Sequence, residues 1–227
     1  MSGKAIFWLK KVVSVAATLL IVNAVLIVFF REVYTASNFW ISILLFNLFT
    51  AADKAVTPFF FQKGREDRHK IQTLIVVLVL FLLPFLVAVP YVEYSLLLKT
   101  LVPPEVSMTL WILGTLMIVA GGSTLVRSRV VLGAHSSVRI GIEENHRLVT
   151  RGPYHVIRHP IYAGVLFFYL GYTISFSSVL TSTILLLFFV PVVRARMALE
   201  EKLLIETFGD EYLEYMKHTK RLIPFVY

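Results

Sequence analysis

The sequence predicts an all-α integral membrane protein with about six hydrophobic helices, the last two of them a tight hairpin, plus a cytoplasmic C-terminal helix. Composition is the first observation: of 227 residues, 57% are apolar and 16% are charged, which is too little polar surface for a water-soluble domain of this size. The second observation is a series of long uncharged runs. The third is that Lys and Arg are confined to the segments between those runs.

Four uncharged runs are each long enough to cross a bilayer once, since one crossing takes about 20 helical residues. They comprise residues 12–30, 33–52, 71–92 and 106–126, and none contains Asp, Glu, Lys or Arg. The first run is long for the apolar part of a signal peptide, so we expect it to remain as an uncleaved span. The N-terminal part of the chain is therefore predicted to be a four-span bundle.

A fifth uncharged run, residues 161–193, is too long for one crossing and gives two helices of about 16 residues each. We expect a tight helical hairpin. Pro160 precedes the run and is well placed to start its first helix, because the first helical position needs no N–H. The turn is expected at Ser175, Phe176, Ser177 and Ser178.

The distribution of Lys and Arg predicts the orientation, because short cytoplasmic loops retain basic residues. With the N-terminus inside, 20 of the 22 Lys and Arg residues lie on the cytoplasmic side and only Arg31 and Lys99 lie outside. Both termini and the candidate cofactor site are then cytoplasmic. The basic face also attracts anionic lipid headgroups, and the charge of +8 needs no nucleic-acid partner to explain it.

A few polar and small residues inside the spans are expected to pack helices together. Asn23 and Asn47 are candidates for hydrogen bonds between helices, and Gly114, Gly121 and Gly122 allow close backbone approach. We assign these five residues to packing.

The chain divides into a transmembrane bundle, residues 1–126, and a cofactor-binding region with the hairpin and terminal helix, residues 127–227. Cysteine is absent, which excludes disulfides, thiolate metal sites and cysteine nucleophiles. We predict no metal ligands. A glycine-rich Rossmann loop is also absent, so a nucleotide-like cofactor would need another mode of binding.

The first polar motif, HRLVTRGPYHVIRHPIYAG, begins at His146 and runs directly into the hairpin. A basic interfacial loop with a helix cap explains Arg147 and Arg151 equally well. It explains less well why Arg158, His159 and Tyr162 cluster at the start of a helix.

The second motif, RARMALEEKLLIETFGDEYLEY, begins at Arg194 and follows the hairpin. Arg196 and Glu200 are four residues apart and share a helical face, although an ordinary helix ion pair would do the same. Folding the hairpin in half brings both motifs to one rim. Such a pocket suits a zwitterionic sulfonium cofactor, because a carboxylate can hold its ammonium group and aromatic faces its sulfonium and adenine.

Together the two motifs resemble the isoprenylcysteine carboxyl methyltransferase family and related small membrane methyltransferases, over about residues 146–224. The resemblance rests on HRLVTRGPY, then RHPIYAG, then an apolar hairpin followed by R, three residues, EE and FGDEYLEY. It implies S-adenosylmethionine as cofactor and a lipophilic or lipidated acceptor that enters from the bilayer. It implies cofactor contacts by His146, Arg147, Leu148, Val149, Tyr154, His159, Pro160, Ile161, Tyr162 and Glu200. Arg196, which matches a substrate contact, and Arg158 are the candidate catalytic residues.

Carboxyl O-methylation of an isoprenylcysteine-like substrate is therefore the expected reaction, and two alternatives stay open. One is an NADPH-dependent enzyme similar to sterol reductases, which typically have Asn in place of Ile161 and an acid in place of Val165. The other is a membrane scaffold or transporter without enzymatic activity.

Overall fold

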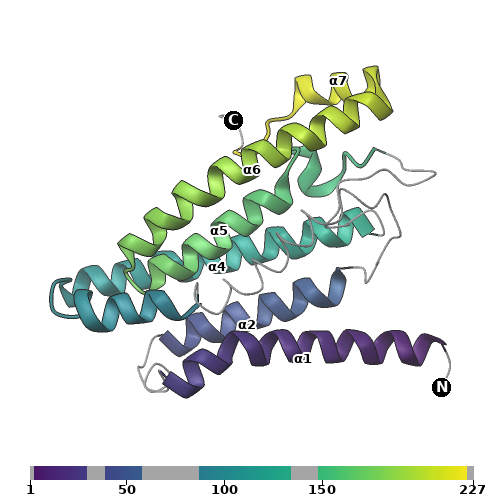
Figure 1. Cartoon of the computed structure of the whole chain (residues 1–227). Coiled ribbons are helices and arrows are strands. Elements are labelled where there is room, and N and C mark those ends of the chain that lie inside the picture. The colour runs from purple at the N-terminus through teal and green to yellow at the C-terminus, as the bar shows by residue number, and fades with distance from the viewer. Residues whose placement is uncertain (1–2, 30–38, 58–86, 134–147, 224–227) are drawn as a thin grey trace.

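The computed structural model describes residues 3–29, 39–57, 87–133 and 148–223, which form a bundle of long helices (Figure 1). The elements in order are α1 (Gly3–Phe29), α2 (Phe39–Val56), a helical stretch 87–98 that ends in the π-helical turn η2 (Tyr94–Leu98), α4 (Pro104–Leu132), the 3₁₀ turn η4 (Gly152–His155), α5 (Pro160–Ser175), α6 (Val179–Phe208) and α7 (Asp210–His218). In these segments the sole β-type pairing is an isolated parallel bridge between Ile157 and Lys220.

Three of these helices, α2, α4 and α6, are long and apolar enough to cross a membrane, and shorter apolar helices cover Lys11–Leu20, Val87–Leu98 and Pro160–Ser175. The prediction of a helical integral membrane protein is confirmed. Most of the predicted span 71–92 lies outside the described residues. The total of about six hydrophobic helices, and the division at residue 126, therefore stay predictions.

The hairpin prediction is confirmed, with one correction. α5 starts at Pro160 and has 16 residues, and the turn consists of Phe176, Ser177 and Ser178, with Ser177 at φ 57°. The second helix, α6, has 30 residues instead of about 16. It continues through the polar motif because nothing after Pro191 breaks it before Gly209, and the bundle tolerates a proline inside a membrane helix.

α4 and α5 are in direct backbone contact along a line of glycines. A Cβ atom added to Gly121 would lie 2.4 Å from the backbone nitrogen of Phe168, and one added to Gly171 would lie 2.6 Å from that of Ile118. No real side chain fits at these distances. The close backbone approach predicted from Gly114 and Gly121 is therefore confirmed, and it sets the position of α5 relative to the rest of the bundle, whereas Gly122 instead faces the ring of Phe49 on α2.

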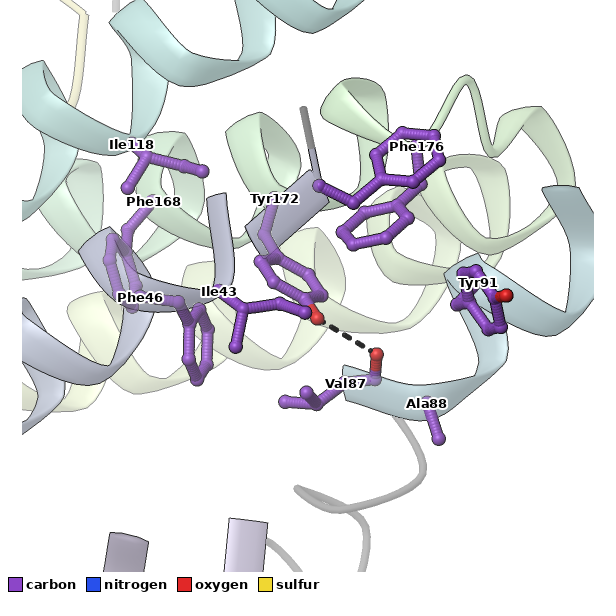
Figure 2. Close-up of a cluster of buried hydrophobic side chains, with 10 residues drawn as sticks. Ile43, Phe46, Val87, Ala88, Tyr91, Ile118, Phe168, Tyr172 and Phe176 are labelled. Carbon is purple, nitrogen blue, oxygen red and sulfur yellow. Dashed lines mark hydrogen bonds between the residues drawn. The ribbon is translucent and has the colours of Figure 1, made fainter. Parts of the chain in front are cut away.

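An aromatic core joins α2, the 87–98 stretch and α5 (Figure 2). The rings of Phe46 and Phe168 stack at 4.8 Å, and the Tyr172 hydroxyl donates a 3.0 Å hydrogen bond to the carbonyl of Val87. Rings of this size bury a large apolar area and prefer such offset contacts. The hairpin is thus held against the first part of the chain at mid-bundle.

Polar contacts hold the rest of the bundle together. The amides of Asn23 and Asn47 exchange hydrogen bonds of 2.9 and 3.0 Å between α1 and α2, which confirms their predicted pairing. Asp53 on α2 accepts a 2.8 Å hydrogen bond from Nε of Arg129 on α4. Buried polar groups in lipid need such partners.

The turn of the hairpin is held by Glu93, which sequence reasoning overlooks because it follows a predicted span. Its buried carboxylate accepts hydrogen bonds from the backbone N–H groups of Leu180 (2.8 Å) and Thr181 (3.1 Å) and from the hydroxyls of Thr181 and Ser178. It therefore caps the N-terminus of α6 from another helix, where a negative charge is favoured.

Candidate active site

The candidate site lies at the end of the bundle away from the hairpin turn, where α5 begins and α6 extends past it toward α7 (Figure 1). The C-terminal segment reaches this point and pairs with the residues that precede α5. The backbone N–H of Arg158 donates to the carbonyl of Lys220 at 2.7 Å, and that of His159 to the carbonyl of Arg221 at 3.0 Å. The C-terminal segment therefore holds the backbone directly before α5.

Glu200, Tyr162 and Arg196 form the first group of the site. Nε of Arg196 donates to the Tyr162 hydroxyl at 2.6 Å and to Oε1 of Glu200 at 3.3 Å, and the Tyr162 hydroxyl donates to the same carboxylate oxygen. The side chains of Arg196 and Glu200 are each 24% exposed. The structure thus brings together residues from both motifs, with a carboxylate and a guanidinium still partly accessible.

His159 lies beside this group and is buried. Its Nε2 is 3.2 Å from Oε1 of Glu201, and its Nδ1 is 3.6 Å from Oε2 of Glu200. Burial acts to lower the pKa of His159, but the two neighbouring carboxylates outweigh it and raise the pKa above its ordinary value. The two carboxylates therefore favour the protonated form of the imidazole, which lies between two consecutive acids of α6.

Glu201 is the site residue that sequence reasoning missed. Its side chain is only 3% exposed, and it binds Nε of Arg158 at 2.9 Å and Nε of Arg221 at 2.9 Å in addition to His159. The EE pair in the second motif was a visible signal, but helical spacing alone does not say which of two adjacent acids faces inward. Its partner Arg221 lies 20 residues away, beyond α7.

Arg158, a candidate catalytic residue, points its guanidinium at protein groups. Besides Glu201, its NH1 donates to the carbonyls of Met216 (3.3 Å) and Thr219, and its side chain is 8% exposed. These contacts tie the end of α7 to the start of α5. Whether Arg158 takes part in catalysis stays a prediction.

Tyr154 in η4 is buried, and its hydroxyl has no hydrogen-bond partner among the residues that the structure describes. Burial raises the pKa of Tyr154 well above its ordinary value, so the hydroxyl stays protonated. The backbone is held by Tyr215, whose hydroxyl donates to the Tyr154 carbonyl at 2.5 Å. Burying a hydroxyl without a hydrogen-bond partner costs free energy, and a bound ligand could supply the partner. Tyr154 therefore fits a ligand-binding position.

The remaining predicted cofactor residues fall in three places. Leu148 and Val149 are half-buried in the segment before η4, and Pro160 and Ile161 form the first turn of α5. His146 and Arg147 lie outside the described residues.

Two cavities border this region: one of about 420 Å³ is lined in part by Glu201 and Arg221, and the other has a volume of about 430 Å³ and lies along α7. The cavity along α7 is lined by Thr150, His155, Glu211, Glu214, Tyr215, His218 and Thr219. Glu200 lines neither cavity. The candidate site is therefore defined by its converging polar side chains and not by a cavity.

Comparisons with known proteins find similarity to methyltransferases. The family model described as phospholipid methyltransferase matches residues 109–211. The chain is 33% identical over 121 residues to protein-S-isoprenylcysteine O-methyltransferase A of Arabidopsis thaliana, covering 50% of this chain and 58% of that protein. It is 32% identical over 117 residues to the protein-S-isoprenylcysteine O-methyltransferase of Saccharomyces cerevisiae, covering 51% of this chain and 49% of that protein. The matched part thus spans about half the length of these relatives.

The fold is also shared with a solved structure of the eukaryotic intramembrane Ras methyltransferase, isoprenylcysteine carboxyl methyltransferase. The TM-score is 0.61 at 18% identity, and the match covers 95% of this chain and 75% of that one. The site residues on α5 and α6 and in η4, namely Tyr154, Arg158, His159, Tyr162, Arg196, Glu200 and Glu201, lie inside the region that the family model matches, whereas Arg221 lies after it. The chain is therefore an integral membrane protein that is similar in sequence to isoprenylcysteine methyltransferases over about half of its length and that shares the fold of one of them over nearly the whole chain.

Proposed function

We propose that the protein is a membrane-embedded methyltransferase that uses S-adenosylmethionine to methylate the carboxylate of a lipophilic, isoprenylcysteine-like acceptor. The observation that carries the proposal is the group of Glu200, Tyr162 and Arg196 at the start of α5, where an accessible carboxylate and an accessible guanidinium lie side by side. The names of the similar proteins support the reaction class.

The residues present suit this donor. Glu200 offers a carboxylate to the ammonium group, which is a charge-assisted contact of the strong kind. The hydroxyl of Tyr154, which has no partner among the described residues, offers a neutral donor and acceptor, and the ring of Tyr162 offers an aromatic face. His159 to Tyr162 form the turn that holds these groups, and Leu148 and Val149 supply apolar contacts nearby.

S-adenosylmethionine, when bound, would supply an electrophilic methyl group for a carboxylate oxygen of the acceptor, with S-adenosylhomocysteine as the leaving group. A carboxylate is ionised at neutral pH, because its ordinary pKa is about 3.5. The chain therefore needs no strong general base, and its task is to hold two partners in line. Arg196 suits the acceptor side, since its planar guanidinium can hold a carboxylate while Glu200, one turn later, holds the donor.

The surface of α6 next to Arg196 favours a lipophilic acceptor. Phe188 and Val192 precede Arg196 by eight and four residues, so all three share one helical face, and the two apolar side chains are 72% and 59% exposed. A hydrocarbon chain lying along this face in the bilayer would bring its polar end to Arg196. Membrane lipids occupy the same face when no acceptor is bound.

We also propose that this end of the bundle faces the cytoplasm. The N-terminal end of α1, the C-terminal ends of α2 and α4 and the start of α5 all lie at the same end as the site (Figure 1). Basic residues of the described chain gather at these ends and on the polar part of α6 and the segment after it, as the positive-inside rule requires of a cytoplasmic face: Lys10, Lys11, Lys54, Arg127, Arg129, Arg158, Arg194, Arg196, Lys202, Lys217, Lys220 and Arg221.

Calorimetric titration of the detergent-solubilised protein with S-adenosylhomocysteine tests the donor. We expect binding, and we expect Glu200→Gln to weaken it by about 1.5–3 kcal/mol through loss of one charge-assisted hydrogen bond. Glu206→Gln is the matched control, because Glu206 is an exposed acid on the same helix, 4.0 Å from Lys202. Its affinity should equal that of the wild type.

Parallel titration with NADPH separates the alternatives. Binding of NADPH in place of S-adenosylhomocysteine would favour a reductase, and binding of neither would favour a scaffold or transporter. Methyl transfer from labelled donor to a farnesylcysteine analogue, compared with phosphatidylethanolamine vesicles, then identifies the acceptor class. Transfer to the phospholipid alone would refute the carboxylate acceptor.

A further inference from the structure

The segment after α7 is built into the candidate site although it lies beyond both motifs. The backbone of Lys220 and Arg221 accepts hydrogen bonds from Arg158 and His159 directly before α5. The next residue, Pro160, lacks an N–H group and starts α5. The C-terminal segment therefore fixes the backbone from which the His159 side chain projects.

The side chain of Arg221 extends this contact into the site. Its Nε and Nη2 atoms lie 2.9 and 2.6 Å from Oε2 of Glu201, while Nε of Arg158 lies 2.9 Å from Oε1 of the same carboxylate. A carboxylate that is 3% exposed is unfavourable unless charged partners surround it. Glu201 is therefore positioned by two arginines, one from each end of the contact between the C-terminal segment and α5.

Glu201 in turn positions the imidazole that faces Glu200. The ring of His159 spans the two consecutive carboxylates of α6, with Nε2 on Glu201 and Nδ1 on Glu200. Consecutive residues of a helix point about 100° apart, so the two acids do not hold each other in place. The rigid ring is the part that couples them.

We propose that Arg221 and Glu201 are positioning residues of the site, which set the orientation of Glu200 through a chain of contacts. The chain runs from Arg221 to Glu201, from Glu201 to His159, and from His159 to Glu200. This inference rests on the proposed function, because it assigns these residues to the donor side of that same site. It makes the segment after α7 a working part of the enzyme, and it gives Arg158 the same positioning role.

The test is a double-mutant cycle on the full chain, read out as affinity for S-adenosylhomocysteine. Arg221→Ala should weaken binding about tenfold when Glu200 is present and less than twofold in the Glu200→Gln background, because the effect passes through Glu200. Arg221→Lys should recover most of the affinity, since it restores a cation beside Glu201. Lys217→Ala is the matched control, because it removes an exposed ion pair of α7 with Glu214 and should leave the affinity unchanged.

Equal weakening in both backgrounds, or wild-type affinity in folded Arg221→Ala protein, would overturn the positioning role. If the alanine variant does not fold, Arg221→Gln and Glu201→Gln carry the same cycle with smaller changes in shape. The outcome is separable from the proposed function. Absence of binding by the wild type refutes the donor, whereas wild-type binding that depends on Glu200 but not on Arg221 refutes this inference alone.

Discussion

The backbone contact between α4 and α5 should be the least tolerant place in the bundle, and Gly121→Ala is the smallest change that probes it. The added Cβ would lie 2.4 Å from the nitrogen of Phe168 and 2.8 Å from the carbonyl oxygen of Gly164. Both atoms belong to the main chain, so no change of rotamer can relieve the overlap. The helices must move apart by about 1 Å to reach an ordinary contact of about 3.5 Å.

The cost follows from what that separation undoes. Membrane helices associate through close packing of small residues, because lipid offers no hydrophobic drive to bring them together. Inserting a methyl group into a well-packed interface costs about 1–3 kcal/mol, and we expect the upper part of that range because the clash is with backbone on α5. At about 2–4 °C per kcal/mol for a chain of this size, 2–3 kcal/mol lowers the unfolding midpoint by about 4–12 °C.

Thermal unfolding of the detergent-solubilised protein, followed by tryptophan fluorescence and by size-exclusion chromatography, measures this midpoint. Ala120→Leu is the control, since residue 120 is on the same turn of α4 but exposed, and leucine adds more volume than alanine does at residue 121. Its midpoint should move by no more than about 2 °C. A Gly121→Ala protein as stable as the wild type, or an equal loss in the control, would refute the close packing of α4 on α5.

Three further predictions concern the site and the topology. Arg196→Ala or Arg196→Lys should lower turnover about 100-fold or more by misplacing the acceptor, with affinity for S-adenosylhomocysteine nearly unchanged; loss of both together would make Arg196 a cofactor or folding residue. The pKa of His159 is raised in the folded protein, so protonation of His159 adds stability. This stability is fully present below about pH 6.5 and is lost as pH rises through the folded pKa, at up to about 1.4 kcal/mol per pH unit. Unfolding midpoints from pH 6 to 9 should show this decline in the wild type and not in His159→Gln, and a flat wild-type profile would contradict it. A reporter fused after Tyr227 should be cytoplasmic, and an exterior signal would contradict the proposed orientation.

The sequence predicted those parts of the fold that follow from local rules. Uncharged length identified membrane helices, Pro160 marked the start of α5, and the serines near residue 177 marked the hairpin turn. It missed the length of α6, because loss of hydrophobicity after Val193 ends the apolar segment without ending the helix. A helix stops at a breaker or cap, and here the first one is Gly209.

The candidate site, too, was predicted only in part from the sequence. The spacing of Arg196 and Glu200 predicted a shared helical face, and their contact is present at 3.3 Å. The spacing is silent about Tyr162, which completes this group from α5, and about which of the two acids turns inward. The burial of Tyr212 on α7, which is 1% exposed, was likewise not predicted from the sequence.

By itself, then, the sequence determined that this chain enters a bilayer and that its polar motifs flank a hairpin, and it predicted which side chains would hold a charged donor. Those properties depend on hydrophobicity and helical period, which neighbouring residues define. Only the tertiary structure decided that Glu93 caps α6, that Arg221 reaches Glu201, and that the Tyr154 hydroxyl is buried without a partner in the described part of the chain. These features depend on how far each helix is rotated and how closely the backbones approach. Packing between separate helices, such as α4 and α5, sets both quantities.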